Sequence, residues 1–513
     1  MWEKSYGGKH ADYLFDVQPT ADYGFILAGS SLSQKTGNKT SDNEGDLDYW
    51  VWKMNEDGDL DWQKNYGGSG ADLLQSIRNT SDGGFILAGT SDSGVGLFKK
   101  DSCRGNEDFW IIKLNAKGNE EWQRTIGGGG RDLVRTISQT QDGGYIIGGS
   151  SDSEQGHNTQ NIGTDKYSKS EKSRGNMDYW IVKLDNQGEI KWQRTLGGKY
   201  VDILESLITT KDGGYLASGF SNSPASQDKS HDGYGEGDYW IIKLDKDGNP
   251  EWQQNLGGES DDHLYSTVQT TDGGYIIAGD SVSNTSGNKK KANKSGTDFW
   301  VVKLDEQGEL LWQETYNTGK TDILTSAVEN VDGTILLGGY AQSETIGTNK
   351  KDKKEINDYI ALKISADGEE IWKETVGSNG EDVLRKVVET RDGGYLLAGT
   401  SKGEISRDKN EGQGKADFWV VKIKDKDKKK EKKKLNIEAI PNPARQFTNI
   451  IIGFEFANGT LSIFDLAGRQ LQSFQVSDRT IPIDLSTYPE GLYVIEVQTD
   501  KGDESVKVIK TRN

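Results

Sequence analysis

The sequence contains very few of the residues that usually carry chemistry. Its 513 residues include one cysteine, Cys103, so an intramolecular disulfide cannot form. The four histidines, His10, His157, His231 and His263, show no zinc-ligand spacing, and no G-x-S-x-G nucleophile motif occurs. These absences leave no catalytic residue to predict.

Long apolar runs and an excess of basic residues are also absent. No stretch of about 18 apolar residues occurs, so we expect no transmembrane segment. No secretory signal peptide is recognisable at the start of the sequence. The formal net charge is −19, whereas a nucleic-acid partner requires a basic surface, so we expect no binding to nucleic acid.

What the sequence does contain is a sevenfold repeat. Tryptophan recurs at a spacing of 60 or 70 residues, at Trp2, Trp62, Trp122, Trp192, Trp252, Trp312 and Trp372. An Asp-aromatic-Trp marker starts at Asp48, Asp108, Asp178, Asp238, Asp298 and Asp417, and Asp358 begins a variant of it. An Asp-Gly-Gly turn, or a close variant, also occurs once in each copy. Three markers in seven copies indicate a repeat architecture.

Each copy contains four segments with strand character, as in DLLQSIRNT, GGFILAGTS, DFWIIKLN and EEWQRTIGG. They are short, rich in β-branched and aromatic residues, and bounded by Gly, Asp and Asn. Four antiparallel strands per copy predict an all-β fold, a seven-bladed β-propeller over residues 1–423. The last copy lacks its fourth strand, and residues 2–8, WEKSYGG, resemble that strand. We therefore predict that they pair with DFWVVKI, residues 417–423, and close the ring.

One set of acidic residues is the candidate ligand-binding site. An aspartate follows each Gly-Gly pair or its variant and precedes the first strand of each blade: Asp12, Asp72, Asp132, Asp202, Asp262, Asp322 and Asp382. The connections that contain these residues share one face with the long Ser-rich loops, and function usually resides on such loops. A carboxylate ring there would hold a cation such as calcium, or bind a basic or sugar ligand. The alternative is that each aspartate accepts bonds from the N–H groups of its own turn. We predict no other cofactor.

The C-terminal part of the sequence differs from the repeats. Residues 424–434, KDKDKKKEKKK, are typical of a solvated linker, and tryptophan is absent from residues 435–513, which have the pattern of a separate β-domain. Its motifs contain, in order, Pro441, Asn442, Pro443, Asp465, Gly468, Arg469, Gly491, Tyr493, Lys507 and Lys510. The Pro-Asn-Pro opening, the DLAGR hairpin, the YPEGLYVIEV strand and the basic end together resemble the type A C-terminal sorting domain of the type IX secretion system, found in Bacteroidota.

The resemblance implies an Ig-like β-sandwich that acts as an export signal. It implies that the outer-membrane translocon and its shuttle are partners, and that a sortase-like peptidase cuts in the linker. It also implies a secreted or outer-surface location, reached through the periplasm after removal of a signal peptide. Propellers of this repeat type commonly accompany that sorting domain.

We therefore predict an exported cell-surface or released binding or adhesion module. We expect its propeller to be monomeric, and its ligand to be an unidentified surface glycan or protein. Two alternatives stay open, a glycan-active hydrolase or lyase and a structural scaffold of surface machinery. Carboxylates clustered in one blade, away from the repeated positions, would favour the enzyme.

Overall fold

The computed structural model describes residues 2–156, 166–344, 355–427, 437–440, 442–444, 447–454, 456–477 and 479–511. Pro441 and most of the predicted linker, residues 428–434, lie outside the described residues. The described part of the chain is built of β-strands and contains no helix long and apolar enough to cross a membrane. It divides into two compact units, the larger of which ends at Lys426 and the smaller of which includes Asp427–Asn513.

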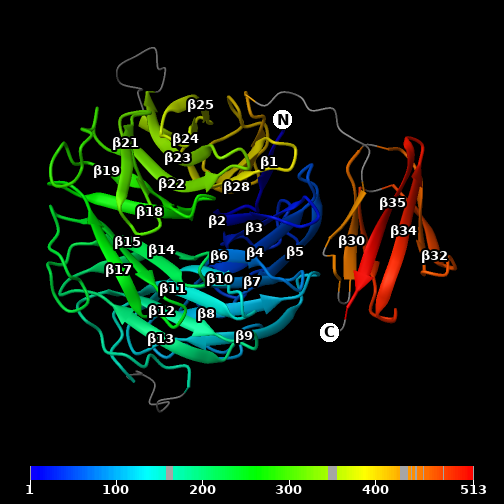
Figure 1. The fold of residues 1–513 in the computed structure, drawn as a ribbon, viewed down its shortest axis with the longest axis horizontal. Helices are drawn as coiled ribbons and strands as arrows, with labels where there is room; N and C mark the ends of the chain where they lie inside the picture. The colour runs from blue at the N-terminus through cyan, green and yellow to red at the C-terminus, as the bar shows by residue number, and fades with distance from the viewer. Residues whose placement is uncertain are drawn as a thin grey trace. The chain divides into compact units, whose positions relative to one another are not determined.

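The larger unit is a seven-bladed β-propeller, as the repeat predicts (Figure 1). Each blade is a four-stranded antiparallel sheet whose strands pair in chain order, apart from the last blade. The first three blades contain β2 (Asp12–Pro19), β3 (Phe25–Ser31), β4 (Asp48–Met54) and β5 (Leu60–Tyr66); β6 (Asp72–Asn79), β7 (Phe85–Ser91), β8 (Asp108–Leu114) and β9 (Glu120–Ile126); and β10 (Asp132–Gln139), β11 (Tyr145–Ser151), β12 (Asp178–Leu184) and β13 (Ile190–Leu196).

The remaining blades repeat the same order. They contain β14 (Asp202–Thr209), β15 (Tyr215–Ser221), β16 (Asp238–Leu244) and β17 (Pro250–Leu256); β18 (Asp262–Gln269), β19 (Tyr275–Ser281), β20 (Asp298–Leu304) and β21 (Leu310–Tyr316); β22 (Asp322–Glu329), β23 (Ile335–Glu344), β24 (Glu355–Ile364) and β25 (Glu370–Val376); and β26 (Asp382–Glu389), β27 (Tyr395–Ser401) and β28 (Asp417–Ile423). The fourth strand of the last blade is β1 (Trp2–Tyr6), which pairs antiparallel with β28. The predicted ring closure is confirmed.

The turns within a blade follow from Asp and Gly chemistry. In the turn between β6 and β7, Asp82 accepts a hydrogen bond from the N–H of Gly84 at 3.0 Å, and Gly83 has a φ of +81°. In the turn between β12 and β13, Asp185 accepts the N–H of Glu189 at 2.9 Å, and Gly188 has a φ of +80°. A positive φ at these positions favours glycine, so the turn residues fix where each hairpin reverses.

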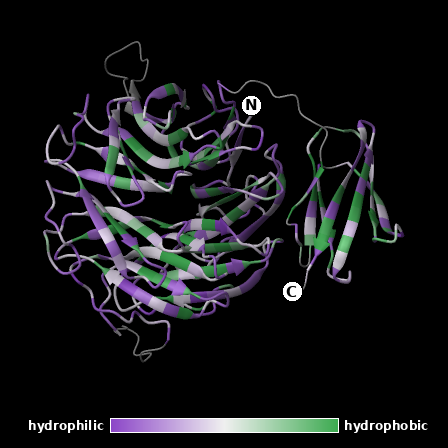
Figure 2. Ribbon diagram, in the orientation of Figure 1, coloured by the Kyte–Doolittle hydropathy of each residue, from purple (hydrophilic) through white to green (hydrophobic). Residues whose placement is uncertain are grey.

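The hydrophobic core lies between neighbouring blades. One cluster joins Tyr49 of blade 1 to Trp110 of blade 2, whose rings lie 4.8 Å apart, and equivalent clusters join the following blades. The repeated Trp62 packs against Gly118 of the next blade, where a Cβ would lie 2.8 Å from the indole ring. Figure 2 shows the hydrophobic residues concentrated along the strands of the blades. The tryptophan repeat is therefore a blade-to-blade packing signal.

The smaller unit is a two-sheet β-sandwich. A three-stranded sheet has the order β29 (Ile437–Ile440), β30 (Phe447–Ile452), β33 (Thr480–Asp484). A four-stranded sheet has the order β32 (Gln470–Val476), β31 (Gly459–Phe464), β34 (Gly491–Thr499), β35 (Gly502–Lys510). Buried side chains of both sheets, among them Ile450 and Ile495, form one shared core. The predicted fold class is confirmed for both units.

Candidate functional site

The seven predicted aspartates lie at the starts of the first strands and are fully buried, with an exposed fraction of 0%. One oxygen of each carboxylate accepts a backbone N–H from four residues earlier. The N–H donors are those of Gly8, Gly68, Gly128, Gly198, Gly258, Thr318 and Ser378, at 2.5–2.8 Å. This is the geometry of the turn-capping alternative. Ligand binding by this set stays a prediction.

A second set of buried aspartates lies beside the first. It consists of the marker residues of the third strands, which start six of these strands and lie inside β24 in the other: Asp48, Asp108, Asp178, Asp238, Asp298, Asp358 and Asp417. The carboxylates of neighbouring blades approach closely, since a Cβ on Gly7 would lie 2.5 Å from Asp417 Oδ1 and 2.8 Å from Asp12 Oδ2. Burial raises the pKa of Asp108 to about 7, and the nearby Asp132 carboxylate contributes to that shift.

Six buried lysines of the long loops accompany these aspartates: Lys39, Lys99, Lys169, Lys229, Lys289 and Lys409. The Lys229 ammonium donates to the carbonyl of Ser223 at 2.8 Å, and Lys409 lies 3.6 Å from Asp417. Among the described residues, no group of three His, Cys, Asp or Glu side chains has the arrangement to hold a metal ion. The buried aspartates and lysines on this face are linked by hydrogen bonds and close charge contacts.

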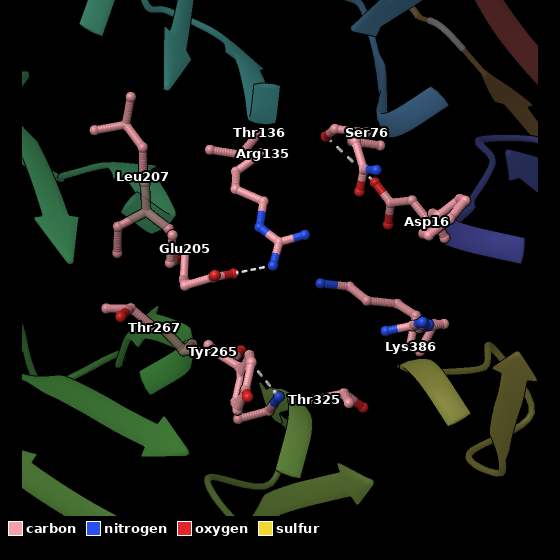
Figure 3. A pocket seen from close by; sticks show the side chains of 18 of the residues that line it. Asp16, Ser76, Arg135, Thr136, Glu205, Leu207, Tyr265, Thr267, Thr325 and Lys386 are labelled. Atoms are coloured by element: carbon pink, nitrogen blue, oxygen red, sulfur yellow. Dashed lines mark hydrogen bonds and ion pairs between the residues drawn. The ribbon is translucent and has the colours of Figure 1, made fainter. Parts of the chain in front are cut away.

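The propeller has a central cavity of about 440 Å³, which the sequence prediction missed. Its lining comes almost entirely from the first strands of the seven blades, and those of blades 2 to 7 contact one another in order around it. Tyr340 of β23 also contributes. Figure 3 shows that side chains from different blades converge on this space. All seven copies therefore contribute side chains to this cavity.

A bulge in six of the first strands selects residues that line the cavity. In β6, β10, β14, β18, β22 and β26 the register with the second strand shifts between the second and fourth residues after the initial aspartate. The bulge lets two successive side chains face the cavity, although side chains of a regular strand alternate between faces. The bulge residues are Gln75, Arg135, Glu205, Tyr265, Thr325 and Arg385. Phe15 holds the same repeat position in β2, and all seven side chains line the cavity.

The bulge position breaks the repeat. Aromatic, amide, hydroxyl, acidic and basic side chains occur at this one position, whereas neighbouring positions keep the same residue type in most copies. A side chain that only filled space in a repeated environment would not need this variety. The variation marks the cavity as the asymmetric part of an otherwise symmetric scaffold.

The residue after the bulge connects neighbouring blades. This position holds Asp16, Ser76, Thr136, Ser206, Ser266, Ser326 and Lys386. Four of these side chains accept an N–H from the first strand of the next blade: Asp16 from Ile77 at 3.0 Å, Ser76 from Ile137 at 3.4 Å, Ser266 from Ala327 at 3.1 Å and Ser326 from Val387 at 3.3 Å. A lysine ammonium has no acceptor, so Lys386 cannot make this connection.

The cavity is positively charged inside an acidic protein. Four cations and two carboxylates line it, a net charge of +2, whereas the whole chain carries −19. Arg78 pairs with Asp16, and Arg135 pairs with Glu205 at 2.5 Å. Asp16 is further engaged by the N–H of Val17 at 2.9 Å. These contacts neutralise both carboxylates.

Arg385 and Lys386 are the two cations that remain. Neither has a carboxylate within ion-pair distance among the residues that the structure describes. The Arg385 guanidinium lies over the Phe15 ring, 5.5 Å from its centroid. Burial lowers the pKa of both groups; for Lys386 the nearby Asp16 carboxylate opposes this shift in part, and the charge of Arg78 adds to it. The low-dielectric surroundings therefore penalise these two charges, and an anion would relieve the penalty.

The predicted motif residues of the C-terminal unit have structural contacts. Asp465 accepts the N–H of Arg469 at 2.9 Å and pairs with its side chain, across the turn that contains Gly468. The Tyr493 hydroxyl donates to the carbonyl of Pro489 at 2.6 Å. Asn442 accepts the N–H of Ile509 at 2.9 Å and donates to the carbonyl of Lys507. Gly491 begins β34, Pro443 follows Asn442, and Lys510, at the end of β35, is buried.

A match to a protein family model identifies the kind of domain that this unit is. Residues 438–511 match the family model described as the secretion system C-terminal sorting domain. These residues form a type IX secretion sorting domain. The sorting domain marks the protein for export, to the cell surface or beyond it, and implies an interaction with the secretion system.

The propeller resembles solved structures only remotely. It is similar to Sqt1 from Chaetomium thermophilum, with 10% identity, a TM-score of 0.41, and coverage of 82% of this chain and 100% of that one. It is also similar to hydrazine synthase of Kuenenia stuttgartiensis, with 9% identity, a TM-score of 0.45, and coverage of 80% and 96%. A puromycin hydrolase gives 11% identity, a TM-score of 0.41, and coverage of 86% and 58%. No curated protein sequence matches the chain significantly.

Proposed function

We propose that the protein is an exported binding module whose propeller holds a small polar ligand in its central cavity. The single observation that carries this proposal is the loss of repeat symmetry at the bulge position, where seven side chains of six residue types converge on one cavity. The sorting domain serves as the export signal, and the propeller contains the binding site.

The size and lining of the cavity support a small hydrophilic ligand. A volume of about 440 Å³ falls within the range of ordinary ligand pockets, roughly 300–1,000 Å³. Hydroxyl, amide and charged side chains line most of the cavity, so a lipid or another apolar ligand fits poorly. A mono- or disaccharide fits the volume and finds hydrogen-bonding partners on every side.

The export partners follow from the sorting domain. We propose that the outer-membrane translocon and its shuttle bind this domain, and that a sortase-like peptidase cuts the lysine-rich segment at residues 424–434. Such a cut would leave the propeller at the cell surface or free in the medium. Propeller and sorting domain thus have separate functions, and their tests are independent.

A variant that fills the central cavity tests the binding proposal. Gln75→Trp places a large ring in the cavity, and it is compatible with the fold because Phe15 and Tyr265 occupy the same repeat position. Gln187→Trp, at an exposed turn position, is the matched control. On a glycan array, the wild type and the control should bind the same saccharides, and Gln75→Trp should lose them. Equal binding by Gln75→Trp would place the ligand elsewhere and overturn the proposal.

The alternative of a glycan-active enzyme has weaker support. The two cavity carboxylates, Asp16 and Glu205, are each paired with an arginine, so neither is free to act as a general acid or base. Burial raises the pKa of the Tyr265 phenol, so the phenol stays protonated at neutral pH and supplies no phenolate to act as a general base. A reducing-sugar assay and an assay for unsaturated uronide products on the array ligands would detect hydrolysis and lysis. Turnover of any array ligand would show that the protein is an enzyme and would overturn the proposal of a binding module.

A further inference from the structure

We infer that the cavity ligand is an acidic sugar, a saccharide whose carboxylate or sulfate group is held between Arg385 and Lys386. This inference rests on the proposed function and names the chemistry of its ligand. It concerns the first strand of blade 7, where two cations take positions that hold uncharged residues in most other blades.

The two cations occupy adjacent positions that both face the cavity. Arg385 is the bulge residue of β26, and Lys386 follows it, so the bulge directs both side chains to the same space. Figure 3 shows the Lys386 side chain and the Arg135–Glu205 ion pair pointing toward one another across the cavity. An anion at this place would contact cations from more than one side.

Blade 6 shows what the same positions contain without this charge. Its residues are Thr325 and Ser326, and Ser326 accepts the N–H of Val387 from blade 7. Lys386 cannot accept the equivalent hydrogen bond from the N–H of Val17 in blade 1. That N–H donates instead to Asp16 of its own strand. The pair Arg385–Lys386 therefore costs a blade-to-blade hydrogen bond and the desolvation of two charges. A ligand that carries a negative charge offsets that cost.

The chemistry of these cations fits an oxyacid. The planar guanidinium of arginine forms two parallel hydrogen bonds with a carboxylate or a sulfate, and the lysine ammonium adds a point charge. Inside a cavity the effective dielectric is lower than in water, so the attraction for an anion is stronger there than on the surface. The same field repels cations, which excludes an amine as the ligand of this site.

The rest of the cavity fits the hydroxyl groups and the ring of a sugar. The Arg135–Glu205 pair offers donors and acceptors together, and Gln75 adds an amide. The Tyr265 and Tyr340 side chains, on blades 5 and 6, supply aromatic surface on which the apolar face of a sugar ring packs. An inorganic anion would use the two cations and leave these groups without partners, so a saccharide fits better.

The experiment replaces the blade 7 pair by the blade 6 pair. Arg385→Thr together with Lys386→Ser gives blade 7 the residues of Thr325 and Ser326, which the fold already accepts. The matched control is Arg131→Gln, which removes an exposed arginine that pairs with Asp152 at 2.9 Å outside the cavity. Full-length proteins are titrated by calorimetry with galacturonate, glucuronate, glucose 6-sulfate, galactose, glucose and inorganic sulfate.

We expect at least one acidic sugar to bind at least tenfold more tightly than its neutral counterpart and than sulfate alone. The double variant should lose this affinity at least tenfold while its melting temperature stays the same or rises, and Arg131→Gln should bind like the wild type. The carboxylated and sulfated sugars distinguish the two oxyacid groups. The affinity should also fall with added salt.

Two results would overturn the inference. Equal affinity for acidic and neutral sugars, with no effect of the double variant, would show that the site does not recognise an acid group. A neutral ligand in the cavity would remain compatible with that result. If inorganic sulfate bound as tightly as the acidic sugars, the sugar part of the ligand would contribute nothing to recognition. Failure of the proposed function itself has a different signature, in which Gln75→Trp leaves the array binding unchanged.

Discussion

The strand that closes the ring is the most consequential element for stability. β1 pairs with β28 from Trp2 opposite Lys422 to Tyr6 opposite Phe418. Tyr6 is 4% exposed, and its ring stacks on Trp52 of blade 1 at 4.4 Å. β1 therefore joins the last blade to the first. Without residues 2–8, the edge of β28 and the core between blades 7 and 1 would be open to water.

The size of the effect follows from these contacts. Removing a buried aromatic side chain such as Tyr6 costs about 3–5 kcal/mol. Each backbone hydrogen bond of the β1–β28 ladder contributes a further ~1 kcal/mol. Glu3 also accepts the indole N–H of the buried Trp419 at 2.8 Å, and that donor would lose its partner. We expect deletion of residues 2–8 to destabilise the propeller by more than about 5 kcal/mol, a fall of roughly 5 °C or more in melting temperature.

The assay is thermal unfolding followed by circular dichroism or calorimetry. The control is Tyr200→Ala, which removes a tyrosine that is 43% exposed and should change stability by less than about 0.5 kcal/mol. A synthetic peptide of residues 2–8, added to the truncated protein, should raise its melting temperature in a concentration-dependent way, because it binds only the folded ring. An unchanged melting temperature after deletion would refute the closure as a source of stability.

Three further predictions concern the buried charges. Burial raises the folded-state pKa of Asp108 to about 7 and that of Asp238 to about 6, above the ordinary value of 3.8, so protonation favours the folded state. The melting temperature should therefore rise as the pH falls from 8 to 5, and a steady fall over this range would contradict the assignment. Gly257→Ala should cost several kcal/mol, because its Cβ would lie 1.7 Å from Asp238 Oδ1. Gly257→Asn should cost less, since Asn317 at the same repeat position donates to its neighbouring carboxylate at 2.7 Å; equal stability losses would refute this reasoning. Calcium titration by calorimetry should give no heat, because the seven predicted aspartates are buried and already accept N–H bonds, and a saturable heat would restore their predicted role as a cation site.

Much of the fold follows from residues that repeat. The Asp-Gly-Gly turns, the Asp-aromatic-Trp strands and the spaced tryptophans each have a local physical reason, so seven copies reinforce one interpretation. The closure by residues 2–8 was predictable because Trp2, Gly7 and Gly8 match the end of a repeat that the last copy lacks. Trp52, outside the repeat positions, is explained only by the structure, where it packs against Tyr6.

The candidate site shows the limit of reasoning from repetition. The seven aspartates were predicted to bind a ligand because every copy contains one. In the structure their carboxylates are buried and accept hydrogen bonds from the N–H groups of their own loops. The side chains that face the cavity were missed because the bulge that exposes them interrupts the alternation of a regular strand. An ordinary period of two would place Arg385 and Lys386 on opposite faces, whereas the bulge brings them together.

A signal for the cavity was nevertheless present in the sequence. The seven copies act as an internal comparison, in which positions that stay constant serve the common scaffold and positions that vary are free to differ in function. Three and four residues after each initial aspartate, the copies range from Phe15 to Glu205 to Lys386, although the residues on either side are apolar in every copy except for Thr267. A ligand without sevenfold symmetry requires a site without it, so the positions that break the repeat are where a propeller of this kind can become specific. By this reasoning the cation pair of blade 7 is the point at which the symmetric scaffold acquires a preference for charge.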